Sequence, residues 1–287
     1  MGTSTRNIGQ NGHNPLIPTW LECDPLPTPE YTTPEEIGAV PEQHGQPQQS
    51  IIPEMKIPPE ADPNRFRGSR VSFTHFVNGG GRNSRSLKNS VANYIRRSLG
   101  GSTNATKRLG VARTNTAGLY GILHTFVETD GLQRVAQFLS LETLKGLPAS
   151  RFFIRLAEFI CPDGGPEDEG ISRSAYYDTL ADNPEIMGKS TENLTKDEIN
   201  SIVQRYMTKV VMHQVLNGIA NKFIRLPDKL EEITHIEDAV EQLIAQSVSD
   251  ACAQVEQEHG EMTNERAKEI TDRIYLKVFQ ILERVGE

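Results

Sequence analysis

Apolar side chains recur at helical spacing along most of the chain beyond residue 86. An interval of three to four positions predicts helices that each bury one face. The intervals indicate helices over residues 87–99, 114–127, 131–139, 148–160, 196–219, 236–255 and 264–282. No segment shows sustained strand alternation flanked by hairpin turns. The pattern therefore predicts an all-α protein, a helical bundle with short connections.

Capping residues mark where several of these helices begin. Residues 195–198 read Thr-Lys-Asp-Glu, a capping box in which the threonine and the glutamate each satisfy a free backbone N–H group of the other. Asp130 and Thr263 are expected to cap two further helices. Pro148 suits the first position of another, because its missing N–H would be unpaired there in any case.

The first 63 residues differ from the rest because they hold 12 of the 17 prolines. Proline fixes φ and removes a backbone donor, which rules out a long helix or a central strand. We expect residues 1–63 to be an extended, proline-rich N-terminal arm and residues 64–287 to be the helical domain. The loop at 161–170, rich in proline, glycine and acidic residues, is a possible boundary between two helical halves.

Charge is distributed in three blocks. Residues 1–63 have a formal charge of −7, residues 64–127 have +11 without one carboxylate, and residues 128–287 have −12. The basic block needs a counter-charge from the acidic remainder, from a neighbouring subunit or from a phosphate-bearing ligand. Nucleic acid is one such ligand, although no motif of stacking aromatics accompanies the block. The predicted basic patch comprises Arg65, Arg67, Arg70, Arg82, Arg85, Arg96, Arg97 and Arg108.

The sequence offers no group of residues typical of catalysis or of metal binding. Cys23, Cys161 and Cys252 are far apart, and the seven histidines never approach one another at ligand spacing. The glycines at 79–81 and 100–101 match neither the P-loop nor the dinucleotide-binding motif. We therefore expect no enzyme activity, no cofactor and no metal. Without a secretory signal or a long apolar run, the expected location is cytoplasmic, with no membrane contact.

Several segments carry a resemblance to a known family. The chain begins Met1-Gly2-Thr3-Ser4 and continues Pro15-Leu16-Ile17-Pro18-Thr19-Trp20. Residues 65–70 read Arg-Phe-Arg-Gly-Ser-Arg, and Phe-Thr-His-Phe, Tyr-Ile-Arg-Arg, Gly-Gly-Ser and Arg-Leu-Gly follow at 73–76, 94–97, 100–102 and 108–110. Over about the first 125 residues the chain thus resembles the QatB family, a component of the QatABCD anti-phage defence systems.

The resemblance implies partners and a role. The partners would be a QueC-like protein (QatC), together with an ATPase (QatA) and a TatD-like nuclease (QatD). The role would be non-enzymatic: the chain docks the QueC-like protein and presents Gly2, once Met1 is removed, for modification with a deazaguanine group. The alternative, which the charge pattern suggests, is a nucleic-acid-binding adaptor that uses residues 64–127. The residues expected to bind the partner are Thr3, Ser4, Pro15, Leu16, Ile17, Pro18 and Trp20.

Overall fold

The computed structural model describes residues 62, 64–161, 167–220, 224, 227–255 and 262–286. The predicted arm, apart from Asp62, lies outside these residues, so its extended form and its boundary at residue 63 stay predictions. In chain order the elements are α1 (Arg67–Asn78), α2 (Ser84–Asn93), the π-helical turn η2 (Tyr94–Ser98), α3 (Ser102–Lys107), α4 (Val111–Phe126), α5 (Gly131–Phe138), α6 (Ala149–Ile160), α7 (Glu167–Ala181), α8 (Pro184–Met187), the 3-10 turn η3 (Thr191–Asn193), α9 (Lys196–Ile219), α10 (Leu230–Val255) and α11 (Asn264–Arg284).

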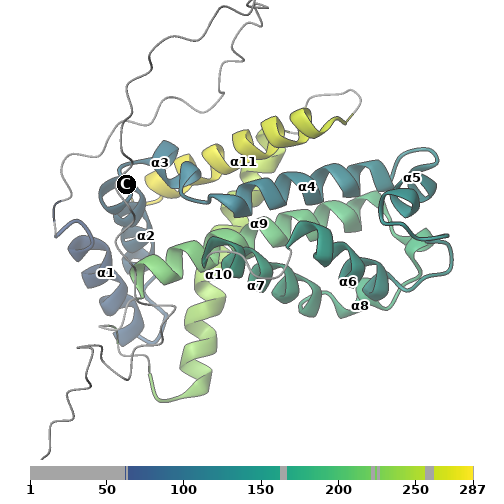
Figure 1. Ribbon diagram of the computed structural model, residues 1–287. Helices are drawn as coiled ribbons and strands as arrows, with labels where there is room; N and C mark the ends of the chain where they lie inside the picture. Colours follow the sequence, from purple (N-terminus) through teal and green to yellow (C-terminus); the bar gives the residue numbers. More distant parts are fainter. Residues whose placement is uncertain are drawn as a thin grey trace, which may run out of the picture. The chain divides into compact units, whose positions relative to one another are not determined.

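Helices make up every regular element of the described residues, which confirms the predicted all-α class. A single bridge, between Pro148 and Ser190, is the only strand-like pairing in that part of the chain. Helix α4 packs along both α9 and α11. Helix α10 also packs against α9 and α11. Figure 1 shows α1, α2 and α3 gathered near the start of α4, whereas α5 lies at its far end.

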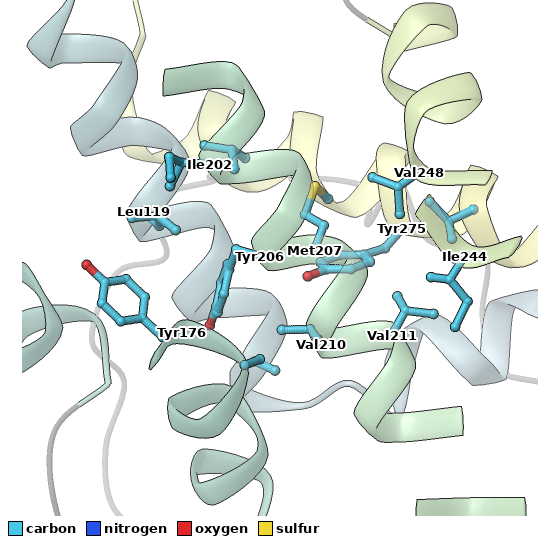
Figure 2. Close-up of a cluster of buried hydrophobic side chains, with 14 of the residues drawn as sticks. Leu119, Tyr176, Ile202, Tyr206, Met207, Val210, Val211, Ile244, Val248 and Tyr275 are labelled. Carbon is cyan, nitrogen blue, oxygen red and sulfur yellow. The ribbon is translucent and has the colours of Figure 1, made fainter. Parts of the chain in front are cut away.

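One continuous hydrophobic core joins these helices. It runs from Phe73 on α1 to Leu282 on α11, with members on both sides of residues 161–170, where the sequence predicts a loop although α7 already begins at Glu167. Figure 2 shows its centre, where Tyr206 of α9 lies between Tyr176 of α7 and Tyr275 of α11. Each large apolar side chain buried here contributes about 1.5–3 kcal/mol to folding. The proposed division at this loop stays a prediction.

The predicted caps meet different outcomes. The capping box is confirmed: Thr195 accepts a hydrogen bond from the backbone N–H of Glu198, whose carboxylate accepts one from the N–H of Thr195. Thr263 likewise caps α11. Asp130 does precede α5, but its φ is 60° and its side chain makes no capping bond, so that capping role was wrong. Pro148 is the residue before α6 rather than its first helical residue.

The helix predicted over residues 87–99 is interrupted. The α-helix ends at Asn93, and the N–H of Leu99 bonds to the carbonyl of Tyr94, five residues back. This wider turn buries Tyr94 and Ile95 while Arg96 and Arg97 stay exposed. Helical periodicity gave no sign of it, because one inserted residue hardly disturbs the apolar spacing.

Two aromatic side chains on the apolar faces of α5 and α6 are not buried. Phe138 and Phe159 are 55% and 44% exposed. Their rings contact each other with centroids 5.5 Å apart. The apolar spacing correctly places each ring on the apolar face of its helix. Both rings nevertheless stay partly exposed to solvent. The pair rims a groove of about 380 Å³ beside α4.

Candidate functional site

The basic block folds into α1, α2, η2, α3 and the start of α4. Seven of its eleven cationic side chains are exposed and the other four are half-buried. The exposed seven are Arg67, Arg82, Arg85, Lys88, Arg96, Arg97 and Arg108, and the half-buried four are Arg65, Arg70, Lys107 and Arg113. The structure thus places the predicted basic patch on neighbouring elements that pack against one another. We call these eleven side chains the basic face.

Three buried serines fix the backbone at the start of this face. The hydroxyl of Ser69 donates to the carbonyl of Phe66 at 2.9 Å. Ser90, from α2, donates to the carbonyl of Ser69 at 2.8 Å, and Ser98, from η2, donates to that of Arg65 at 2.9 Å. Each bond gives a buried serine hydroxyl a hydrogen-bond partner. The first turn of α1 is therefore held from two other elements.

Two arginines stack on one aromatic ring at this turn. The guanidinium carbon of Arg65 lies 5.1 Å from the centroid of Phe66, and that of Arg70 lies 4.9 Å from it. Phe66 itself packs against the hydrophobic core. Such cation–π contacts orient a guanidinium while leaving its in-plane N–H groups available. The Nε–H of Arg70 is buried without a hydrogen-bond partner among the described residues.

Tyr94 lies behind this stack. Its ring centroid is 6.3 Å from that of Phe66, and its hydroxyl donates to the carbonyl of Gln214 near the end of α9, at 3.2 Å. Burial raises the pKa of Tyr94, and the positive charge of Arg108 opposes that rise. The aromatic pair thus connects the segment before α1 with η2 and α9, beneath Arg65 and Arg70.

Among the residues that the structure describes, few cations of the basic face form ion pairs with carboxylates. Within the described residues, the ion pair that this face makes joins Arg113 to Asp272 of α11, at 2.9 Å. Arg96 donates to the backbone carbonyl of Glu283 at 2.8 Å. Elsewhere, Lys209 shows how the bundle pairs a cation that it buries, with Asp182 at 2.7 Å and Glu241 at 2.9 Å. Ion pairs among the described residues therefore account for little of the charge of the basic face.

A buried polar cluster joins α4, α7 and α9, and the sequence gave no sign of it. The hydroxyls of Ser172 and Tyr206 share a hydrogen bond of 2.6 Å, and Asn115 donates to Ser172 at 2.9 Å. Cys161 lies beside them, 3.5 Å from Ser172, and is 1% exposed. Burial raises the pKa of the Cys161 thiol despite these hydrogen bonds. A neutral, enclosed thiol is a poor nucleophile. The hydrogen bonds of the cluster instead connect α4, α7 and α9.

The arm residues singled out from the sequence, Gly2 and Trp20 among them, lie outside the described residues. In the part of the chain that the structure describes, no group of three or more His, Cys, Asp or Glu side chains could hold a metal ion. No described helix is both long and apolar enough to cross a membrane. His213 of α9 lies with its Nε2 2.9 Å from a carboxylate oxygen of Asp178 on α7.

Comparison with protein families gives one match, over residues 100–282, to the family described as Qat anti-phage system associated protein QatB. The search of curated proteins and the search of solved structures found no match. The matched range starts at α3 and covers well over half of the chain. It overlaps the segments that first suggested the family only at residues 100–102 and 108–110. The acidic helices therefore carry the likeness as well, and the chain belongs to the QatB family of anti-phage system proteins.

Proposed function

We propose that this QatB-family protein is a docking and presenting component of its defence complex. The helical body binds a QueC-like partner, and the N-terminal arm delivers Gly2 to that partner for modification with a deazaguanine group. Family membership over residues 100–282 is the observation that carries the proposal. The basic face supports it, because Arg65 and Phe66 lie where the arm joins the body. A partner bound to this face would be beside the root of the arm.

The chemistry of the terminus suits such a role. Removal of Met1 would expose the α-amine of Gly2, whose ordinary pKa near 8 leaves a useful neutral fraction at pH 7. Glycine has no side chain to obstruct a narrow pocket. Thr3 and Ser4 can hydrogen-bond as an extended strand, and Trp20 offers a large apolar anchor. The prolines around it lower the entropy lost on docking.

Intact-mass measurement tests the proposal. The chain is purified after expression with and without the QueC-like protein, and a mass increase located at Gly2 is expected only with the partner. Deleting residues 2–20 should abolish the increase while the helical body still folds. The matched control shortens the arm by deleting residues 40–52, which leaves the first 20 residues intact and should keep the modification. An unmodified glycine terminus after co-expression would refute it.

A second function is favoured by the exposed arginines. The basic face would bind the phosphates of nucleic acid and so make the chain a nucleic-acid adaptor within the complex, beside the ATPase and the TatD-like nuclease. Charge reversal at Arg96 and Arg97, both exposed on η2, should weaken binding. Affinity should fall with salt by about 0.7–0.9 log unit per phosphate contact for each tenfold rise. Absence of a gel shift at low salt would eliminate this function.

A further inference from the structure

We propose that the Arg65–Phe66–Arg70 stack is a preorganised phosphate-binding site. The inference rests on the second function above and makes it specific, because it selects a few side chains from the eleven of the basic face. It also predicts how they bind: through phosphate oxygens, without reading bases.

The stacking geometry is the first argument. With both guanidinium carbons about 5 Å from the ring centroid, Arg65 and Arg70 are each oriented by the same side chain. A guanidinium held by its face presents its N–H groups at its edge, which is the arrangement that binds two oxygens of a phosphate.

Rigidity is the second argument. The bonds from Ser69 and Ser98 fix the carbonyls of Phe66 and Arg65, so the backbone that carries both arginines is held before any ligand arrives. Phe66 is fixed in turn by Tyr94, which is 2% exposed. A preordered site loses less conformational entropy on binding than one built from mobile surface side chains.

The charge environment is the third argument. Within the described residues, no carboxylate lies within ion-pair distance of Arg65, Arg70 or Arg108, and residues 64–127 contain none at all. The nearest one along the sequence, that of Asp62, accepts a hydrogen bond from the backbone N–H of Asn64. Two positive charges over one ring repel each other, and an anion between or beside them relieves that repulsion.

The ring's role decides between phosphate and base recognition. A protein that stacks bases on phenylalanine leaves the face of the ring open. Here two guanidinium groups cover Phe66, and the side chain packs partly into the core. We therefore expect sequence-independent binding, with similar affinity for oligonucleotides of different base composition.

Fluorescence anisotropy with a short labelled single-stranded oligonucleotide tests the site in the full-length chain. The test variant is Arg65→Gln with Arg70→Gln. Its matched control, Arg151→Gln with Lys145→Gln, removes two exposed cations outside the basic face. A third variant, Arg65→Lys with Arg70→Lys, keeps the charge but loses the planar stacked groups. Circular dichroism melts confirm that all three variants fold.

The expected results separate a specific site from general positive charge. The glutamine variant should lose about tenfold or more in affinity at low salt, and its salt slope should fall by about 1.4 log units for two lost contacts. The lysine variant should also lose affinity but keep most of the slope. The control should bind like the natural chain. Inorganic pyrophosphate should displace the oligonucleotide from the natural chain. It should not do so in the glutamine variant, which lacks Arg65 and Arg70.

Five outcomes would overturn the site. Equal losses in the glutamine variant and the control would reveal general electrostatics, and unchanged binding by the lysine variant would show that stacking is irrelevant. Displacement of the oligonucleotide by a poly-glutamate peptide at lower concentration than by pyrophosphate would assign the surface to an acidic protein. If binding instead depends on Arg82, Arg85 and Lys88, the adaptor function stands and this site does not. If the natural chain binds neither oligonucleotide nor pyrophosphate, both fail.

Discussion

Replacing Gly218 with alanine tests how tightly α9 is packed against the basic end of the bundle. A Cβ atom at this position would lie 2.1 Å from the hydroxyl oxygen of Tyr94 and 2.4 Å from its Cζ. Real Cβ atoms essentially never come closer than 3.0 Å to another heavy atom. Tyr94 has little room to retreat, because its ring is buried and its hydroxyl already bonds to Gln214. The added methyl group must therefore displace either the tyrosine or the helix.

The expected cost follows from these contacts. Overpacking a dense core costs about 1–3 kcal/mol, and loss of the hydrogen bond of a buried hydroxyl costs about 1–3 kcal/mol more. The better helix propensity of alanine returns less than about 1 kcal/mol. Gly218→Ala should thus lower the free energy of unfolding by about 2–5 kcal/mol, a large part of the 5–15 kcal/mol typical of a domain.

Urea denaturation followed by circular dichroism measures the change. Gly170→Ala is the matched control, since it also replaces a helical glycine but the new Cβ would meet no atom within 4 Å. That control should leave stability unchanged or raise it slightly. In a Tyr94→Leu background the added penalty at Gly218 should shrink, because the shorter side chain vacates the space. The reasoning is refuted if Gly218→Ala is as stable as Gly170→Ala.

Three further predictions test other parts of the structure. Thr195→Ala removes the capping box and should cost about 1 kcal/mol in thermal or urea unfolding, whereas no loss would mean that the cap is redundant. Tyr206→Phe should cost about 1–2 kcal/mol and should be non-additive with Ser172→Ala, because both remove the same hydrogen bond. Arg113→Met should cost about 1–3 kcal/mol at pH 7 by leaving the Asp272 carboxylate without its partner. Burial already raises the pKa of Asp272 and loss of the arginine raises it further, so the folded state then binds a proton more tightly than the unfolded chain. The penalty should therefore shrink as the pH falls from 7 towards 4.5, and a constant penalty would contradict this.

Local sequence signals predicted the helices that have a clear cap or a regular apolar stripe. The capping box at Thr195 and the dense apolar stripe of α4 are visible within a few residues of sequence, and both predictions held. Helix α1 was missed because Gly68, Ser69 and several β-branched or aromatic residues give it poor intrinsic propensity. It forms through tertiary contacts instead, with Phe73 and Phe76 almost fully buried.

The candidate site depended on contacts that no local pattern encodes. The sequence placed Arg65 and Arg70 in one basic block, and the structure stacks both on Phe66, which packs against Tyr94. Their order rests on hydrogen bonds between residues 21 to 120 positions apart. Spacing along a chain predicts which face of a helix is apolar, but it does not tell which helix will cover that face.

The family match and the fold together lead to a last prediction, about where the chain can be shortened. The match starts at residue 100, which suggests that the preceding helices are dispensable. The packing argues against this, because α2 and η2 contact α11 while α1 and η2 contact α9.

A fragment of residues 100–287 would lose eight large side chains that are each no more than 3% exposed: Phe73, Phe76, Val77, Leu87, Val91, Tyr94, Ile95 and Leu99. Their burial contributes about 12–24 kcal/mol in all at about 1.5–3 kcal/mol each, and even a third of that sum rivals the whole stability of a domain. A fragment of residues 62–287 keeps the entire described core. It should unfold cooperatively near the midpoint of the full chain, whereas 100–287 should be aggregated or unfolded. Cooperative unfolding of the shorter fragment at a similar urea midpoint would show that α1, α2 and η2 form a separate unit.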